Sequence, residues 1–139
     1  MFAWFQGPAV LPKRKFAWKR GHFKLSDAWH SFENKATDLP ASIDLREKLP
    51  PIYDQGELGS CVSNSVSFAV QFDLMNNNLT LADPSNKVDT AMKSRLFLYY
   101  NCRVLDNSVD SDAGTSIHSA VQALTSLGIP DESVWSYSP

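Results

Sequence analysis

The sequence predicts a mainly helical domain that follows an extended N-terminal arm. Three segments have the apolar spacing of helices: residues 60–76, 91–105 and 116–127. Residues 39–54 contain three prolines, which keep that stretch extended or turning because proline lacks an N–H donor and restricts the residue before it. The aromatic residues of positions 1–38 follow neither a helical nor a strand period. We therefore divide the chain into an arm, residues 1–38, and a helical domain, residues 39–139.

The first predicted helix runs from about Ser60 to Asn76 and ends in a run of three asparagines. Its apolar residues recur at spacings of three, four and seven. They are Val62, Val66, Ala69, Val70 and Phe72. This pattern predicts a buried central helix with one apolar stripe.

Two later helices follow a polar loop that is predicted at residues 79–90. The helix at about 91–105 is the more apolar and carries a phenylalanine and two tyrosines. The helix at 116–127 has apolar residues at spacings of four, three and three. Thr115 is its predicted N-cap and Gly128 is predicted to end it, since glycine is favoured just past a helix C-terminus.

Length and composition limit the function classes. With 139 residues, 43% of them hydrophobic, the chain can bury one modest core. A net charge of −2 gives no reason to expect a nucleic-acid partner. There is no run of about 18 apolar residues, so we expect no membrane span. The N-terminus lacks both the basic start and the continuous apolar core of a secretory signal, so secretion is not expected.

Charge divides the chain unevenly. Residues 1–32 contain six lysines and arginines against one aspartate, a net charge of +5, which leaves −7 for the remainder. Basic and aromatic residues are interleaved in the arm, without a regular period, and could stack on the bases or contact the phosphates of single-stranded nucleic acid. The alternative is a strap or short pro-segment whose aromatic residues dock on the acidic domain. We favour the strap because opposite charges attract the arm to that domain.

One motif points to covalent chemistry: Gln55-Gly56-Glu57-Leu58-Gly59-Ser60-Cys61, directly before the first predicted helix. A cysteine on the first turn of a helix meets unpaired N–H groups and the positive end of the helix dipole, which favour the nucleophilic thiolate. A free cysteine is more often a small buried hydrophobe. The glycines and the glutamine amide favour a nucleophile, Cys61, with an oxyanion donor, Gln55.

The pattern Gln-Gly-x-x-Gly-Ser-Cys resembles that of the papain-like cysteine peptidases. Further stretches of the chain resemble the start of the family's mature domain, its second helix, its substrate-flanking glycine loop and the end of its first subdomain. These stretches are residues 39–46, 94–102, 113–116 and 128–137. The resemblance covers residues 39–139 and is strongest to prokaryotic and viral members.

The resemblance implies a role for several residues and for the fold. Cys61 matches the nucleophile and Gln55 the glutamine of the oxyanion hole, while Gly114, with Gly59, matches the glycines that border an extended substrate. The family fold is α+β, and this chain would supply its helical subdomain without the β-barrel subdomain. No cofactor or metal is implied. A cytoplasmic or virion-associated location fits better than secretion.

Two features depart from the lysosomal and plant members. Leu58 stands where those enzymes have a cysteine that would pair with the residue matching Cys102, so Cys102 is expected to be a free thiol packed as a hydrophobe. The family's histidine and asparagine lie about 130 to 150 positions after the nucleophile. Only 78 residues follow Cys61, so both are expected beyond residue 139. His22, His30 and His118 match neither.

Two functions follow as hypotheses. The first is a cysteine-type peptidase that acts on peptides or proteins, with histidine and asparagine supplied by a continuation of the chain or by a second polypeptide. The second is a truncated, non-catalytic relative that binds peptides or proteins through the face on which the barrel would pack. The chain would then be a binding module rather than an enzyme.

Overall fold

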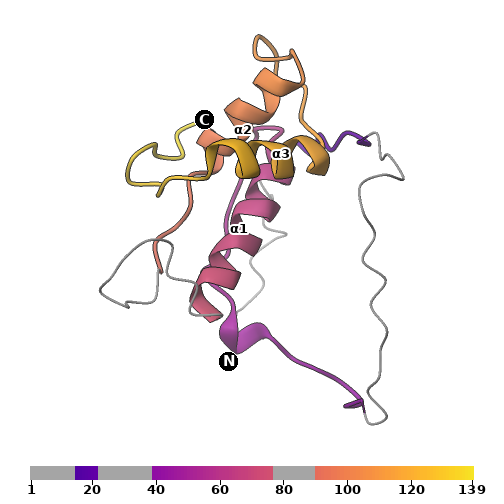
Figure 1. The fold of residues 1–139 in the computed structure, drawn as a ribbon, viewed down its shortest axis with the longest axis vertical. Coiled ribbons are helices and arrows are strands. Elements are labelled where there is room, and N and C mark those ends of the chain that lie inside the picture. Colours follow the sequence, from indigo (N-terminus) through magenta and orange to yellow (C-terminus); the bar gives the residue numbers. More distant parts are fainter. Residues whose placement is uncertain (1–14, 22–38, 77–89) are drawn as a thin grey trace, which may run out of the picture.

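The computed structural model describes residues 15–21, 39–76 and 90–139. Its elements are a single turn of 3₁₀ helix, η1 (Arg46–Lys48), and three α-helices, α1 (Cys61–Asn76), α2 (Arg95–Leu105) and α3 (Ile117–Leu127). Figure 1 shows α1 along the long axis of the molecule, with α2 and α3 gathered around its upper end. These described ranges contain isolated β-bridges but no strand, so the predicted mainly helical fold is confirmed.

The hydrophobic core lies where the first turns of α1 meet α2 and α3. Five buried residues form it: Val62, Leu98, Cys102, Ala120 and Ala123. Cys61, Val66, Leu124 and Ile129 pack against this cluster and are partly buried. Because Val62 belongs to the core, packing fixes the N-terminal turn of α1, which carries Cys61.

The buried face of α1 is largely polar, which corrects part of the predicted apolar stripe, although Val62 is buried as predicted. Ser63, Asn64 and Ser67 are buried, whereas Ala69 is exposed and Val70 is half-buried. The serine and asparagine side chains are small enough for neighbouring segments to approach closely. Ser63 and Asn64 also hydrogen-bond to the carbonyl of Ser60, directly before the helix, which offsets the cost of burying them, whereas the buried hydroxyl of Ser67 has no partner among the described residues. The more exposed part of the stripe, Ala69 and Val70, lines a pocket.

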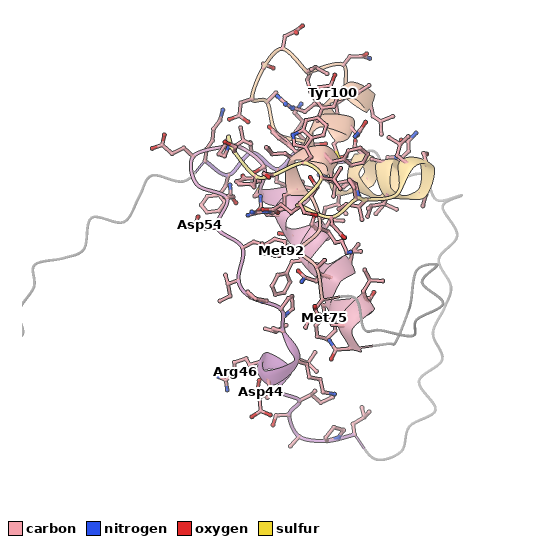
Figure 2. The ribbon with its side chains drawn as sticks, turned by 90° about the vertical axis from the view of Figure 1, so that its left-hand side faces the viewer. Asp44, Arg46, Asp54, Met75, Met92 and Tyr100 are labelled. Atoms are coloured by element: carbon pink, nitrogen blue, oxygen red, sulfur yellow. The ribbon has the colours of Figure 1, made fainter. Side chains whose placement is uncertain are left out.

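Two hydrogen bonds of the Gln71 side chain anchor the middle of α1. The fully buried Gln71 donates from its Nε2 to the carbonyl of Thr90 at 2.9 Å and accepts from the hydroxyl of Tyr53. Tyr53 lies near the end of the proline-containing stretch, residues 39–54, which is extended apart from η1. Figure 2 shows this stretch alongside α1, from Asp44 and Arg46 at the far end up to Asp54. The prediction of an extended or turning segment here is confirmed apart from the unpredicted turn η1.

The caps of α2 and α3 are serines. Ser94 accepts a hydrogen bond from the backbone N–H of Phe97, so α2 begins four residues later than predicted. Ser116, not Thr115, caps α3 by accepting from the N–H of Ser119. The Thr115 hydroxyl is engaged elsewhere, because it donates to Asp106 at 2.7 Å. Gly128 ends α3 with φ of 71°, as predicted.

Arg95, at the start of α2, is a buried charge with partners on three other segments. Its guanidinium donates to both carboxylate oxygens of Glu132, at 2.9 and 2.7 Å. Its third nitrogen donates to the carbonyl of Asp54 at 3.0 Å and to Asn64 at 3.2 Å. A bidentate carboxylate and two further acceptors satisfy the guanidinium, which compensates for its burial.

Two tyrosine rings enclose the same guanidinium. Its carbon lies 3.8 Å from the ring centroid of Tyr137 and 4.8 Å from that of Tyr53. Planar guanidinium groups stack on aromatic faces, which a lysine ammonium does less well. Arg95 therefore joins α1, α2, the segment before α1 and the C-terminal segment.

The predicted loop at 79–90 falls almost entirely on residues 77–89, which lie outside the described residues, as do His22 and His30. No helix within the described ranges is both long enough and apolar enough to cross a membrane.

Replacing Arg95 with alanine should lower the free energy of unfolding by about 3–5 kcal/mol, because Glu132 would remain partly buried without its partner. Urea denaturation followed by circular dichroism measures this change. Arg46→Ala is the matched control, since Arg46 pairs with Asp44 on the surface, with its side chain 84% exposed, and its loss should barely move the midpoint. Equal losses in the two variants would contradict the structural role of Arg95.

Candidate active site

The predicted nucleophile and the predicted oxyanion donor come together at the start of α1. Cys61 is the first residue of the helix and is half-buried, while Gln55 is buried, with 8% of its surface exposed. Gly56 has φ of 59°, a conformation that glycine adopts without strain, and turns the chain between them. The loop thus brings the glutamine amide back toward the helix start.

Cys61 borders two hollows. One, of about 310 Å³, is lined also by Gln55, Tyr53 and Phe68. The other, of about 420 Å³, runs along α1 and is lined mainly by apolar residues. Its lining includes Trp18, Val62, Val66, Ala69, Val70 and Ile117. Cys61 therefore lies at the edge of both hollows.

The side-chain amide of Gln55 is fully engaged. Its Nε2 donates to the carbonyl of Leu58 at 2.9 Å, which holds the amide within its own loop. The same nitrogen donates to the carbonyl of Lys15 at 2.8 Å. Both donors of this amide are thus occupied, one of them by a carbonyl of the arm.

The arm continues from Lys15 across the two glycines that the resemblance singled out. Trp18 forms a parallel bridge with Thr115, and the N–H of Lys19 donates to the carbonyl of Thr115 at 2.9 Å. A Cβ on Gly114, whose φ is 70°, would lie 1.6 Å from the carbonyl oxygen of Ala17. Only glycine permits this approach of the arm.

Gly59 meets the same stretch of the arm. A Cβ added there would lie 2.9 Å from the Cβ of Ala17 and 2.8 Å from Oδ1 of Asp112. Gln55, Gly59 and Gly114 therefore meet one short segment of the arm, and Cys61 lines the same hollow as its Trp18.

Asp112 holds the two glycine segments together, a role that the sequence analysis missed. Its carboxylate accepts from the N–H of Gly59 at 3.0 and 3.1 Å and from the hydroxyl of Tyr99 at 2.6 Å. The Tyr99 hydroxyl in turn accepts from the N–H of Gly114 at 3.1 Å. Asp112 also receives the ammonium of Lys15 at 2.7 Å. Its position two residues before Gly114 was the one available signal.

The charged form of Asp112 is favoured by these contacts. Burial alone raises the pKa of the carboxyl, but the hydrogen bonds from Lys15, Tyr99 and Gly59 outweigh it, so the pKa lies below its usual value. Burial raises the pKa of Tyr99 above its usual value, and the hydrogen bond to Asp112 raises it further. Asp112 is thus a carboxylate and Tyr99 a neutral donor at neutral pH.

Tyr137 fixes the other side of the motif. Its hydroxyl donates to the carbonyl of Gln55 at 2.8 Å and lies 2.6 Å from the hydroxyl of Ser60. Asn64, one turn into α1, donates to the same Ser60 hydroxyl at 2.9 Å. The motif is therefore held from the C-terminal segment as well as from its own helix.

The two cysteines differ in their surroundings. Both are free thiols, as expected for Cys102, which is fully buried in the core. Burial raises the pKa of the Cys102 thiol to about 11. Cys102 is therefore an inert thiol at neutral pH, whereas Cys61 is accessible.

The described part of the chain offers Cys61 no imidazole partner. His118 is exposed on the first turn of α3, and no hydrogen bond joins it to Cys61. No group of three or more metal-ligating side chains occurs in residues 15–21, 39–76 and 90–139. The carboxylate of Asp106, directly after α2, accepts hydrogen bonds from the hydroxyls of Thr115 and Ser119, so both of its oxygens have a protein partner.

Comparison with known proteins identifies two relatives, while no family model matches the sequence. An uncharacterized peptidase C1-like protein of Acanthamoeba polyphaga mimivirus is 38% identical over 103 residues, which are 73% of this chain and 30% of the viral protein. Xylellain, a cysteine protease from Xylella fastidiosa, matches in structure with a TM-score of 0.73 and 29% identity, over 93% of this chain and 46% of xylellain. The chain thus spans less than half the length of either relative.

Iodoacetamide at pH 8 should alkylate Cys61 at least about tenfold faster than Cys102, because the Cys102 thiol is buried and almost fully protonated at that pH. Peptide mapping by mass spectrometry after timed quenching measures both rates. Labelling of Cys102 should rise toward pH 11, as the thiolate forms. Equal rates at pH 8 would contradict the difference between the two environments.

Proposed function

Because this chain belongs to the papain-like cysteine peptidase family, we propose that it carries the nucleophilic half of a cysteine peptidase active site. Cys61 is the nucleophile and Gln55 the oxyanion donor. The main observation that supports this proposal is that the two residues border the same hollow. Cys61 has a half-buried thiol on the first turn of α1, and Gln55 has a buried amide. The peptide carbonyl under attack would enter where the Lys15 carbonyl now accepts from Gln55.

The reaction proposed for the site is acyl transfer. The Cys61 thiolate forms a C–S bond to the carbonyl carbon, and the negative charge moves to the carbonyl oxygen. The amide of Gln55 and the backbone N–H of Cys61 are the two donors for that oxygen, and each such donor typically contributes about 3 kcal/mol. Collapse of the intermediate breaks the C–N bond, and the amine leaves with a proton. Water then releases the acyl group as an acid.

The imidazole that takes and returns this proton is proposed to come from outside the 139 residues, together with an orienting asparagine. A continuation of the chain or a second polypeptide would supply both. In support, His118 makes no hydrogen bond to Cys61. The apolar hollow along α1, with Ala69 exposed and Val66 and Val70 half-buried, is a suitable face for that second subdomain.

The arm is proposed to act as a pro-segment. Its Lys15 carbonyl occupies the Gln55 amide, and Ala17 and Trp18 cover Gly114 and the adjacent backbone. The Lys15 ammonium pairs with Asp112 of the acidic domain. A substrate could not enter without displacing this segment, so the arm would hold the site inactive.

A peptide-binding module without catalysis is the alternative. One observation favours it: a short segment of peptide chain, Lys15 to Lys19, already lies on the site through backbone and side-chain contacts. Binding of extended peptides would then be the function, and Cys61 would be dispensable. Cleavage that depends on Cys61 separates the two functions.

The protein expressed from its complete gene should cleave peptides, and Cys61→Ala should reduce the rate by at least about a thousandfold, since the nucleophile is lost. Hydrolysis of a mixed fluorogenic peptide library measures this. Cys102→Ala is the matched control and should retain cleavage, because its thiol is buried in the core. Binding of peptides that persists without any cleavage would favour the non-catalytic module.

Removing residues 1–38 should raise the rate at which a peptide epoxide labels Cys61 by about tenfold or more, because the Lys15 carbonyl no longer occupies Gln55. Intact-mass spectrometry follows the labelling. A synthetic peptide of residues 13–22 should slow it again, while a scrambled peptide of the same composition should not. An unchanged labelling rate after removal would contradict the pro-segment.

A further inference from the structure

One residue of the arm makes both a backbone and a side-chain contact with the site. The Lys15 carbonyl accepts from Gln55 Nε2 at 2.8 Å. The Lys15 ammonium donates to the carboxylate of Asp112 at 2.7 Å and to the backbone carbonyl of Asp112 at 2.7 Å. The oxyanion donor and Asp112 are thus close enough for a single extended lysine residue to reach both.

This spacing bears on substrate choice. In acyl transfer, the residue whose carbonyl is polarised by the oxyanion donor is the one that precedes the bond to be broken. The position reached by its side chain is therefore the binding site for the residue before that bond. In this chain the residue bound to the oxyanion donor is Lys15, and its side chain reaches the carboxylate of Asp112. Asp112 therefore lies at the binding site for the residue before the scissile bond.

We propose that Asp112 selects substrates with lysine or arginine before the scissile bond, with Lys15 of the arm occupying the same place until it is displaced. The inference rests on the proposed peptidase function and names its substrate class. Either basic side chain is long enough to place a donor on the carboxylate. Arginine can in addition bind both carboxylate oxygens at once.

Asp112 is suited to this role by how it is held. The N–H of Gly59 and the hydroxyl of Tyr99 fix the carboxylate in place without neutralising it. Its side chain is 28% exposed, so an incoming side chain can reach it. Among the described residues, Lys15 is the cation that pairs with Asp112. Departure of the arm therefore leaves a fixed negative charge at the site.

The arm occupies this place without being positioned for cleavage. Its carbonyl accepts from Gln55, but no hydrogen bond joins it to the backbone N–H of Cys61 within the described residues. Only one of the two proposed oxyanion donors is therefore engaged. A substrate would need to engage both, which distinguishes it from the arm.

The experiment uses the protein from its complete gene with Lys15→Gln, so that the arm no longer competes for Asp112. Two fluorogenic peptides differ only in the residue before the reporter bond, lysine in one and norleucine in the other. The readout is the ratio of their kcat/KM values, because a ratio cancels any general loss of activity. We expect a ratio of at least about five, which Asp112→Asn reduces to near one and Asp112→Glu partly restores. Asp110→Asn, an exposed carboxylate two residues away, should leave the ratio unchanged.

Two results would overturn the inference. If both peptides are cleaved equally, or if the lysine preference survives Asp112→Asn, Asp112 does not select the substrate and the peptidase function stands. If neither peptide is cleaved and a peptide epoxide does not label Cys61, the peptidase function itself fails and the inference fails with it.

Discussion

The buried guanidinium of Arg95 is the interaction on which the rest of the structure depends. It lies at the start of α2, yet its partners are the segment before α1, α1 itself and the C-terminal segment. The hydrophobic core is small and consists largely of alanine, valine, leucine and cysteine side chains. Such a core packs three helices but cannot hold the long connecting segments. A charged group with five donors can, provided that each donor finds an acceptor.

The site is built from these connecting segments rather than from the helices alone. Arg95 holds Asp54 and Tyr137, and Tyr137 holds the carbonyl of Gln55. On the opposite side, Asp112 and Tyr99 join the loop of Gly59 to the loop of Gly114. The thiol of Cys61 thus stands on a helix turn that the core fixes, between two loops that polar contacts fix. Preorganisation of this kind is what the proposed oxyanion site requires, because its donors must not rearrange during reaction.

The sequence predicted the helices well because they depend on local spacing. The positions of Gln55 and Cys61 follow from six residues of chain and a helix start. Prediction from the sequence failed where the burial or the contacts of a residue depended on partners far away in the chain. The apolar stripe of α1 was expected to be buried, but Ala69 is exposed, while Ser63 and Asn64 are buried because hydrogen bonds to the Ser60 carbonyl satisfy them. Little in the sequence indicated the role of Asp112 beyond its closeness to Gly114, since its donors come from positions 13 and 53 residues away.

The buried thiol of Cys102 has a consequence for the conditions under which the fold persists. Leu58 leaves it without a sulfur partner, and it fills a place in the core as an aliphatic side chain would. No cross-link between described residues then contributes to the free energy of folding. The stability of the helical domain is therefore independent of the thiol–disulfide potential of its surroundings, and a reducing glutathione pool does not lower its free energy of unfolding. A change in that potential would act on the accessible sulfur of Cys61, and so on chemistry rather than on structure.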